Sequence, residues 1–250
     1  ILTGEFMKFD YLKDITQHTY GLGIIDLVKV TGTKTETSID AMSDDRSVIV
    51  QAKVHKPIAD FVGQFGMPNL TKLNIILNIP EYKDDATIPV TTVEKNGNKV
   101  LAGLHFENTA GDFKNDYRFM SAELINEQLK QVKFKGAKWN VEFEPSVANI
   151  QRMKFMAAAN SDETTFVAKT ENNNLYFYFG DHSSHAGNFV FASGVTGTIA
   201  KGFNWPVSVV LSILGLPGDK KFQISDEGAA QITVDSGLIS YTYIIPAHQK

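Results

Sequence analysis

Two histidines three residues apart form the stretch of this sequence that most resembles a chemical site. They lie in Asp181-His182-Ser183-Ser184-His185, a polar segment with a glycine close by on either side. Imidazole nitrogen is a common zinc ligand, but a zinc site takes at least three protein ligands. His182 and His185 supply two, and no third ligand is evident near them. We therefore interpret the segment as a polar hairpin loop, and an enzyme centred on these histidines stays an alternative.

No other segment has the residue types and spacing that catalysis needs. Gly194-Val195-Thr196-Gly197 lacks the lysine and the length of a phosphate-binding loop. No serine, histidine and aspartate stand in the setting of a nucleophile elbow. The chain has no cysteine, which excludes disulfides and thiolate chemistry and fits a reducing compartment. The sequence therefore predicts a protein that is not an enzyme and that needs no cofactor and no metal.

The composition is that of a globular protein outside the membrane. The chain of 250 residues is 43% hydrophobic and 21% charged, and no apolar run is long enough to cross a bilayer. With 24 basic and 28 acidic residues, its formal net charge is −4. A nucleic-acid partner therefore requires the basic residues to gather on one face. Residues 1–6, ahead of Met7, read as a cloning remnant and are left out of the fold.

The most sharply delimited element is a short helix between Pro206 and Pro217. Apolar residues at 207, 210, 211 and 214 repeat with the spacing of one buried helical face. Proline suits the start of a helix, where its missing N–H has no partner, and Gly215 followed by Pro217 is typical of a helix end. The stretch from Pro57 to Pro68 has the same punctuation 149 residues earlier. We interpret the two stretches as copies within an internally duplicated chain.

The elements around these capped helices follow one order in both halves: a helix, strands, the capped helix, and further strands. This order predicts an α+β fold of duplicated domains, each with antiparallel sheets and two helices on one face. We expect domains at 7–120 and 139–250, with a lysine-rich interdomain connector at 121–138. In the first half a helix is expected at 10–20 and strands at 24–30, 36–41, 48–54, 70–79, 90–94, 99–106 and 117–120. In the second half a helix is expected at 145–160 and strands at 139–143, 164–169, 174–179, 189–192, 199–203, 230–234 and 238–245.

The end of the chain resembles the terminal strand of the DNA sliding clamps, which are polymerase processivity factors. It reads Ser240-Tyr241-Thr242-Tyr243-Ile244-Ile245-Pro246-Ala247, an aromatic-rich strand that stops at a proline. The segment Gln223–Gly228 and the hairpin turn at Asp235-Ser236-Gly237 are similar to the same part of that family. Two domains per chain resemble the phage or archaeo-eukaryotic type of clamp. The resemblance implies a homotrimeric ring around duplex DNA, in the cytoplasm of the host cell if the protein is phage-encoded.

The ring implies three sets of residues, each inferred from position in the family pattern. Subunits would pair sheet edges at 116–120 and 188–193, with Tyr117, Phe119, Phe189 and Phe191 as interface residues. Sequence-independent contact with DNA phosphates would come from Lys8, Lys13, Lys56, Arg152, Lys154 and Lys201. DNA polymerase and clamp-loader peptides would bind Leu124, Ile125, Leu129, Tyr243, Ile245, Pro246 and Ala247. The main alternative is a non-enzymatic phage or viral structural protein with a duplicated β-rich domain.

The capped helices themselves offer almost no charge to DNA. Asp60 and Gln64 occupy the polar face expected for one, and Ser208 and Ser212 that of the other. We therefore expect them to act as spacers and expect the other helix of each domain to carry most of the phosphate contact.

Overall fold

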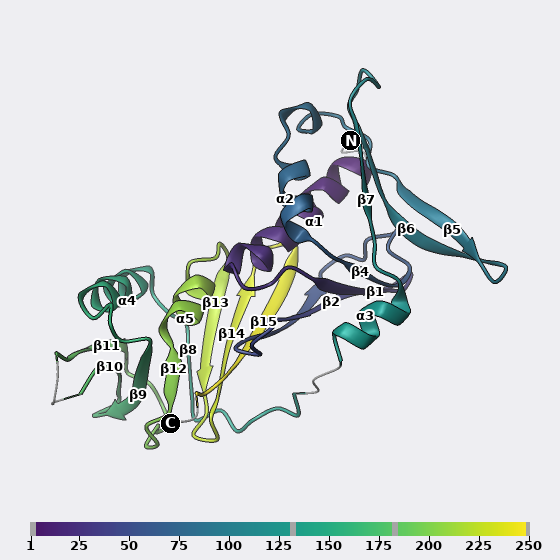
Figure 1. Cartoon of the computed structure of the whole chain (residues 1–250). Coiled ribbons are helices and arrows are strands. Elements are labelled where there is room, and N and C mark those ends of the chain that lie inside the picture. Colours follow the sequence, from purple (N-terminus) through teal and green to yellow (C-terminus); the bar gives the residue numbers. More distant parts are fainter. Residues whose placement is uncertain (1–3, 131–133, 182–184, 249–250) are drawn as a thin grey trace. The chain divides into compact units, whose positions relative to one another are not determined.

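The chain forms two compact units, and each combines antiparallel strands with helices (Figure 1). The computed structural model describes residues 4–130, 134–181 and 185–248. The first unit holds the chain up to Asp44, residues 50–130 and the short segment Ser236–Tyr241. The second unit holds residues 45–49, the chain from Phe134 to Asp235, and the chain from Thr242 onward.

The first half of the chain is built as a helix, four strands, a helix and three strands. In order these are α1 (Gly4–His18), β1 (Val28–Gly32), β2 (Thr37–Met42), β3 (Ile49–Val54), β4 (Gly63–Met67), α2 (Leu70–Leu77), β5 (Val90–Lys95), β6 (Asn98–Glu107) and β7 (Lys114–Arg118). Single 3-10 turns cover Tyr20–Leu22 and Pro80–Tyr82. One set of strands has the order β4-β1-β2-β3, and the other has the order β5-β6-β7. Helix α3 (Ala122–Gln128) follows β7 and packs on β4.

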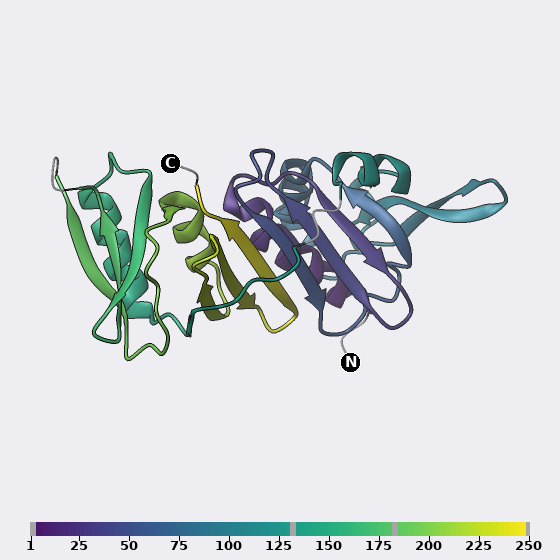
Figure 2. The same cartoon turned by 90° about the horizontal axis from the view of Figure 1, so that it is seen from below.

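The second half repeats this order after one added strand. Its elements are β8 (Val141–Phe143), α4 (Val147–Ala159), β9 (Thr165–Glu171), β10 (Asn174–Phe179), β11 (Gly187–Ser193), β12 (Asn204–Pro206), α5 (Val207–Leu214), β13 (Asp219–Ile224), β14 (Ala229–Asp235) and β15 (Ile239–Pro246). The strands β12-β9-β10-β11 lie in the same order as β4-β1-β2-β3. Helix α1 packs against α2, and α4 packs against α5 and β11. Figure 2 shows α4 on one face of the strands β9–β11. The predicted duplicated α+β fold is therefore confirmed.

The predicted offset of 149 residues between the two copies of the duplicated helix is wrong. Helix α5 lies where the capped helix was predicted, with Pro206 and Gly215 at its two caps. Its counterpart is α2, which lies 137 residues earlier in a stretch that was predicted to be a strand. The stretch Pro57–Pro68 contains β4 instead of a helix, so the offset of 149 paired a helix with a strand. The strand expected at 199–203 is also displaced, because the observed strand is β12.

Local chemistry explains why α2 is helical and the segment before it is extended. Asn69 caps α2 by accepting a hydrogen bond from the Lys72 amide at 3.2 Å. The buried residues of α2 lie along one helical face: Leu70, Leu73, Ile76 and Leu77. In β4, Phe65 and Met67 are buried through pairing with β1, whereas Val62, which a helical face would have buried, is 47% exposed. Tertiary pairing with β1 therefore decides the conformation of β4.

Candidate partner-binding pocket

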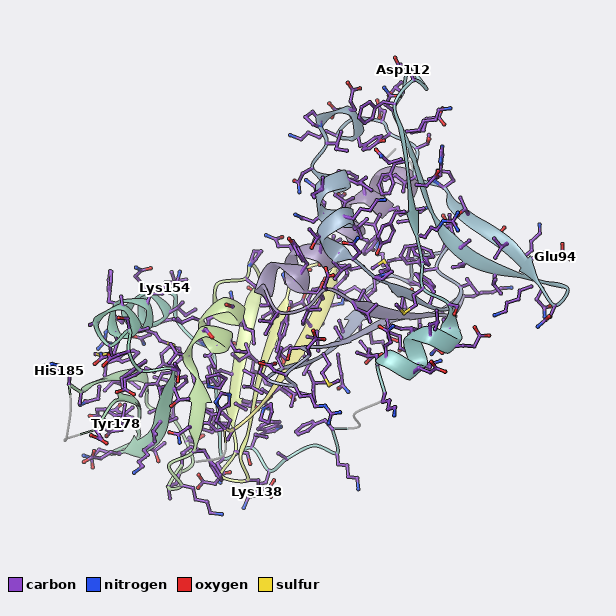
Figure 3. All side chains as sticks on the ribbon, in the orientation of Figure 1. Glu94, Asp112, Lys138, Lys154, Tyr178 and His185 are labelled. Carbon is purple, nitrogen blue, oxygen red and sulfur yellow. The ribbon has the colours of Figure 1, made fainter. Side chains whose placement is uncertain are left out.

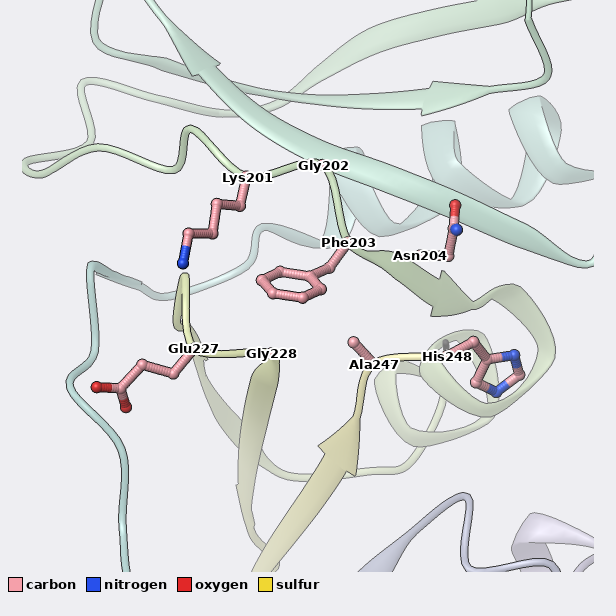
Figure 4. Close-up of a pocket in the computed structure, with 8 residues that line it drawn as sticks. All are labelled: Lys201, Gly202, Phe203, Asn204, Glu227, Gly228, Ala247 and His248. Atoms are coloured by element: carbon pink, nitrogen blue, oxygen red, sulfur yellow. The ribbon is translucent and has the colours of Figure 1, made fainter. Parts of the chain in front are cut away.

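A concave pocket of about 560 Å³ lies within the second unit (Figure 4). Three chain segments form it: the loop before β12, the turn between β13 and β14, and the chain after β15. The ring of Phe203 and the methyl group of Ala247 point into the space between these segments. The lining residues are Lys201, Gly202, Phe203, Asn204, Glu227, Gly228, Ala247 and His248. An apolar floor with a charged rim suits a peptide that inserts an apolar anchor.

Main-chain hydrogen bonds hold the three segments together. The amide of Ala247 donates to Gly228 O at 2.9 Å, and the amide of His248 donates to Asn204 O at 2.8 Å. The chain after β15 is thereby fixed between the other two walls. The carboxylate of Asp226 accepts from the amides of Ala200 and Lys201 at 3.0 and 3.1 Å, which ties the loop to the turn. The pocket walls are therefore set before any ligand binds.

The conformation of the chain at position 228 favours glycine. Its φ of +90° is one that residues with a side chain rarely adopt. A Cβ added there would lie 3.4 Å from the Phe203 ring, which is an ordinary van der Waals contact, so the backbone conformation and not the available space favours glycine. The turn Ser225–Gly228 closes through a hydrogen bond from the Gly228 amide to Ser225 O at 3.3 Å. This turn lies in the segment Gln223–Gly228 that carries part of the resemblance.

The predicted partner-binding residues of β15 divide into two groups. Tyr243 and Ile245 are fully buried, so their side chains belong to the core. This burial contradicts the prediction that they contact a partner peptide directly. Pro246 is exposed, and Ala247 lines the pocket. Sequence reasoning missed Phe203 and Asn204 because they come from a segment without a motif of its own, and it used Glu227 only as part of the resemblance in Gln223–Gly228. The signal that could have found them is the proline-stopped strand end, since any pocket beside it needs further walls.

The predicted partner-binding residues of the connector also differ in exposure. Leu124 is 50% exposed, whereas Leu129 is 9% exposed and Ile125 is fully buried. Helix α3 begins at the cap residue Ser121, whose Oγ accepts from the Leu124 amide at 3.4 Å. Ile125 packs over Gly66 of β4, where an added Cβ would lie 3.0 Å from Ile125 Cδ1. Ile125 therefore docks α3, and Leu124 is the apolar side chain that α3 presents to solvent.

Two of the lysines predicted to contact DNA, Lys8 and Lys13, have side chains that interact with other residues of the chain. The Lys8 side chain is 5% exposed, and its Nζ lies 2.6 Å from Asp60 Oδ2 and donates to Ile88 O at 2.8 Å. This geometry contradicts contact between Lys8 and phosphate, because a buried and paired ammonium cannot reach DNA. Lys13 lies over the ring of Phe9, with its Nζ 5.3 Å from the ring centroid. It is only partly exposed.

The other predicted DNA contacts lie at the surface. Lys56, Arg152, Lys154 and Lys201 are all exposed. Arg152 donates to Asn149 Oδ1 at 2.9 Å and to Val190 O at 3.2 Å, so its guanidinium joins α4 to β11. Lys201 differs from the rest, because it lies at the rim of the pocket.

The exposed helix faces carry few charges, and some of their residues are apolar. Val147 and Phe155 of α4 are 85% and 66% exposed, and Ile75 of α2 is 61% exposed. The polar face of α5 presents Ser208 and Ser212, the two residues that the sequence predicted there. For α2 the expected Asp60 and Gln64 do not apply, because they precede the helix.

The two segments predicted to pair between subunits overlap strands at sheet edges. Strand β7 ends the order β5-β6-β7, and β11 ends the order β11-β10-β9-β12. The aromatic side chains named for the interface face the core instead. Tyr117, Phe189 and Phe191 are 3%, 7% and 0% exposed, and Phe119 stacks on Phe65 with ring centroids 4.1 Å apart. These strands therefore present main-chain hydrogen-bonding groups at the sheet edges, and the aromatic side chains pack against the core on the inner face of the strands.

A polar cluster crosses from β6 to the edge strand β7. His105 Nδ1 lies 2.7 Å from Asp116 Oδ1, and its Nε2 lies 3.2 Å from Glu107 Oε2. Lys114 Nζ lies 3.4 Å from the same Glu107 oxygen. The hydrogen bond to Asp116 raises the pKa of His105, with a further contribution from Glu107, although burial opposes it. Both ring nitrogens are occupied, so the cluster orients β7 on β6.

The histidine loop provides no metal site within the described part of the chain. His182 lies outside the described residues, and His185 is exposed. Among the residues that the structure describes, no group of three or more potential ligands is placed to hold a metal ion. Nor is any described helix long and apolar enough to cross a membrane.

The fold is shared with solved structures along nearly the whole chain. A PCNA from A. fulgidus, solved with the C-terminal region of FEN-1 bound, has a TM-score of 0.70 and 10% sequence identity. That match covers 97% of this chain and 96% of the other. A PCNA from Thermococcus kodakaraensis has a TM-score of 0.66 and 9% identity, and the match covers 99% and 98% of the two chains. No protein-family model and no curated protein sequence matches this chain.

These matches define the class of fold first. The chain has the fold of the DNA sliding clamps, as its terminal strand predicted. Within that class it is similar to PCNA, and its two halves repeat one order of helices and strands.

Proposed function

We propose that this protein is a DNA sliding clamp, a ring-shaped polymerase processivity factor that encircles duplex DNA without reading its sequence. The observation that carries the proposal is the likeness to PCNA over 97% of the chain, together with the repeated order of elements in the two halves. A clamp acts topologically and performs no bond chemistry, so no catalytic residues are assigned. The likeness favours a clamp over a viral structural protein or an enzyme centred on the histidines.

The ring is proposed to be a homotrimer closed head to tail through strand edges. Strand β7 of one copy would pair with β11 of the next, since both strands end their sheets. Pairing two different edges is a heterologous contact, which closes into a ring when the rotation between copies allows it. A phage origin, with a place in the host cytoplasm, is part of the same expectation.

The DNA contacts are proposed to be few. The residues of the predicted set that remain for phosphate contact are Lys13, Lys56, Arg152, Lys154 and Lys201, of which Lys201 also lies at the rim of the pocket. Binding that neutralises few phosphates releases few counterions, so its affinity depends weakly on salt. A ring needs no strong grip, because topology keeps it on the DNA.

Partner proteins are proposed to bind through the pocket that Ala247 lines. The related A. fulgidus protein was solved with the C-terminal region of FEN-1 bound, which supports peptide binding as a property of this fold. By the same reasoning, a DNA polymerase and a clamp loader would each insert an apolar anchor beside Phe203 and Ala247.

The test of the clamp is retention on closed DNA. The protein should have three times the 27.6 kDa mass of one chain in solution or after loading. Loaded onto nicked circular DNA it should stay bound through gel filtration, and cutting the circle once should release it. A control with the circle cut before loading separates sliding from simple affinity. Equal loss from circular and linear DNA would overturn the proposal.

A further inference from the structure

A row of side chains runs from the pocket across the adjacent sheet to two tyrosines. Asn204, which lines the pocket, pairs across β12 and β9 with Val167, and Val167 pairs across β9 and β10 with Tyr178. Directly paired residues in a sheet project from the same face. The pocket wall and Tyr178 therefore belong to one continuous surface.

A second row lies beside the first. Lys169 of β9 pairs with Tyr176 of β10, which pairs with Val190 of β11. A Cβ added to Gly202, another pocket residue, would lie 3.2 Å from Lys169 Cε and 3.4 Å from Val167 Cγ1. Lys169 thus lies over Gly202, at the junction between the pocket and the sheet.

The two tyrosines form the apolar part of this surface. The rings of Tyr176 and Tyr178 stack with centroids 5.9 Å apart, and both residues are partly exposed. Burial raises the pKa of Tyr178, with smaller contributions from Glu171 and Tyr176, so its hydroxyl group stays protonated at neutral pH. Figure 3 shows Tyr178 on the side of the sheet away from Lys154 of α4. The surface therefore faces away from the helices.

The junction combines two exposed lysines, Lys169 and Lys201, with two carboxylates of the adjacent turn, Asp226 and Glu227, which accept hydrogen bonds from main-chain amides. Lys169 and Lys201 are both exposed, and neither ammonium group forms an ion pair with another residue that the structure describes. The Lys169 side chain beside Gly202 and the Lys201 side chain at the pocket rim favour a carboxylate in any chain that leaves the pocket in this direction.

We propose that the pocket continues over Lys169 onto Tyr176 and Tyr178 as a docking groove for an acidic peptide segment that flanks the partner's apolar anchor. The proposal rests on the function proposed above for the pocket. Strand β10 lies two strand spacings from β12, or about 10 Å, which about three residues of extended peptide span. The bound segment therefore places an Asp or Glu beside Lys169 and Lys201, and an apolar or proline residue on the tyrosines about three residues from its anchor.

The first experiment selects binders with a random 12-residue peptide library displayed on phage. Selection on the wild-type protein is followed by removal of peptides that also bind Phe203→Ala, which lacks the aromatic floor of the pocket. The remaining peptides should share an apolar anchor with an acidic residue one or two positions away. Selection on Lys169→Glu/Lys201→Glu should yield basic residues at that position instead. Pocket binders without any acidic preference would overturn the groove and leave the clamp proposal standing.

The second experiment measures affinity for one selected peptide by fluorescence anisotropy. Removing one aromatic contact should weaken binding about 2–10-fold in Tyr176→Ser and in Tyr178→Ser. Lys169→Ala/Lys201→Ala should weaken it by a similar factor, and that loss should disappear at high salt. Phe155→Ala removes an exposed aromatic side chain from α4 and should leave the affinity unchanged. Equal affinity for all these proteins would overturn the groove.

Two further outcomes also overturn the groove. Failure to select any peptide sensitive to Phe203→Ala removes the pocket as a partner site, whereas retention on circular DNA tests the ring separately. A change in oligomer mass in Tyr178→Ser would assign the tyrosine surface to a second copy of this chain. Unchanged thermal unfolding of each variant, followed through the fluorescence of Trp139 and Trp205, checks that the unit has folded.

Discussion

Substitution of Gly66 by alanine should destabilise the first unit, because β4 and α3 approach each other too closely for a methyl group. A Cβ at this position would lie 3.0 Å from Ile125 Cδ1, 3.1 Å from Ile125 Cγ1 and 3.0 Å from Met120 Cβ. Favourable contacts between carbon atoms are about 3.5–4.0 Å. All three distances therefore fall short of this range by at least about 0.4 Å.

The neighbours of Gly66 cannot all move away. Met120 is held to it by two main-chain hydrogen bonds, of 2.8 and 2.9 Å, so relief on that side stretches both. Ile125 is fully buried and fixes α3 on β4. Overpacking of this kind costs about 1–3 kcal/mol, and we expect Gly66→Ala to lower the free energy of unfolding by that amount.

A double-mutant cycle with Ile125→Val tests the stated cause. On its own, Ile125→Val removes Cδ1 and should cost about 0.5–1.5 kcal/mol. In the Gly66→Ala protein the same change relieves one clash and should cost little or nothing, so the two effects should couple by at least about 0.5 kcal/mol. Gly21→Ala, where the nearest atom would be 3.8 Å away, serves as the control and should not destabilise.

The assay combines urea unfolding followed by circular dichroism with hydrogen exchange of the α3 amides. Both tryptophans, Trp139 and Trp205, lie in the second unit, so fluorescence alone would not report the change. Exchange in residues 121–129 should speed up in Gly66→Ala and slow again in the double variant. Strictly additive costs, or a Gly66→Ala protein as stable as the parent, would refute the packing argument.

Three further predictions concern single polar contacts. Tyr241→Phe keeps the ring that stacks on His18 but removes the 2.7 Å hydrogen bond to the Asp14 carboxylate, and should cost about 1.5–3 kcal/mol in urea unfolding; a loss below the error of the measurement would contradict it. Asn69→Ala loses the cap of α2 at a φ of +47° and should cost about 1–2 kcal/mol, whereas Asn69→Gly should cost only a few tenths. The pKa of His105 is raised in the folded state, so its stabilisation is complete below its ordinary value of 6.5 and is lost as pH rises through the folded pKa. The stability difference between wild type and His105→Gln should therefore shrink by about 0.2–1 kcal/mol from acidic to alkaline pH, and a constant difference would rule out the charge as its source.

Much of the architecture could be predicted from local chemistry. Helix α5 was predicted with its bounds because Pro206 and Gly215 mark its ends and its apolar residues have helical spacing. The hairpin of β5 and β6 was predicted because Asn96-Gly97 suits a tight turn, and both residues do have positive φ. The duplicated order of elements followed from such signals in both halves.

The candidate site could be predicted only in part. The proline-stopped end of β15 placed Ala247 at a pocket, but the other walls come from residues 201–204 and 227–228. Which side chains of a strand face outward depends on the layer that covers it. Tyr243 and Ile245 are buried for that reason, and the sequence cannot reveal such a layer. Lys8 is a similar case, since its ion-pair partner Asp60 lies 52 residues away.

By itself, the sequence determined the class of fold, the number of helices and strands within a few, and the absence of cysteine chemistry. The tertiary structure decided the register of the duplication. Residues 57–68 carry a helical apolar pattern. However, residues 63–67 form a strand, because pairing with β1 buries Phe65 and Met67. The helix begins only after this strand, with Asn69 as its cap. A short amphipathic segment gains little from its own hydrogen bonds. The face that its neighbours can bury therefore decides its conformation, and only the folded chain specifies those neighbours.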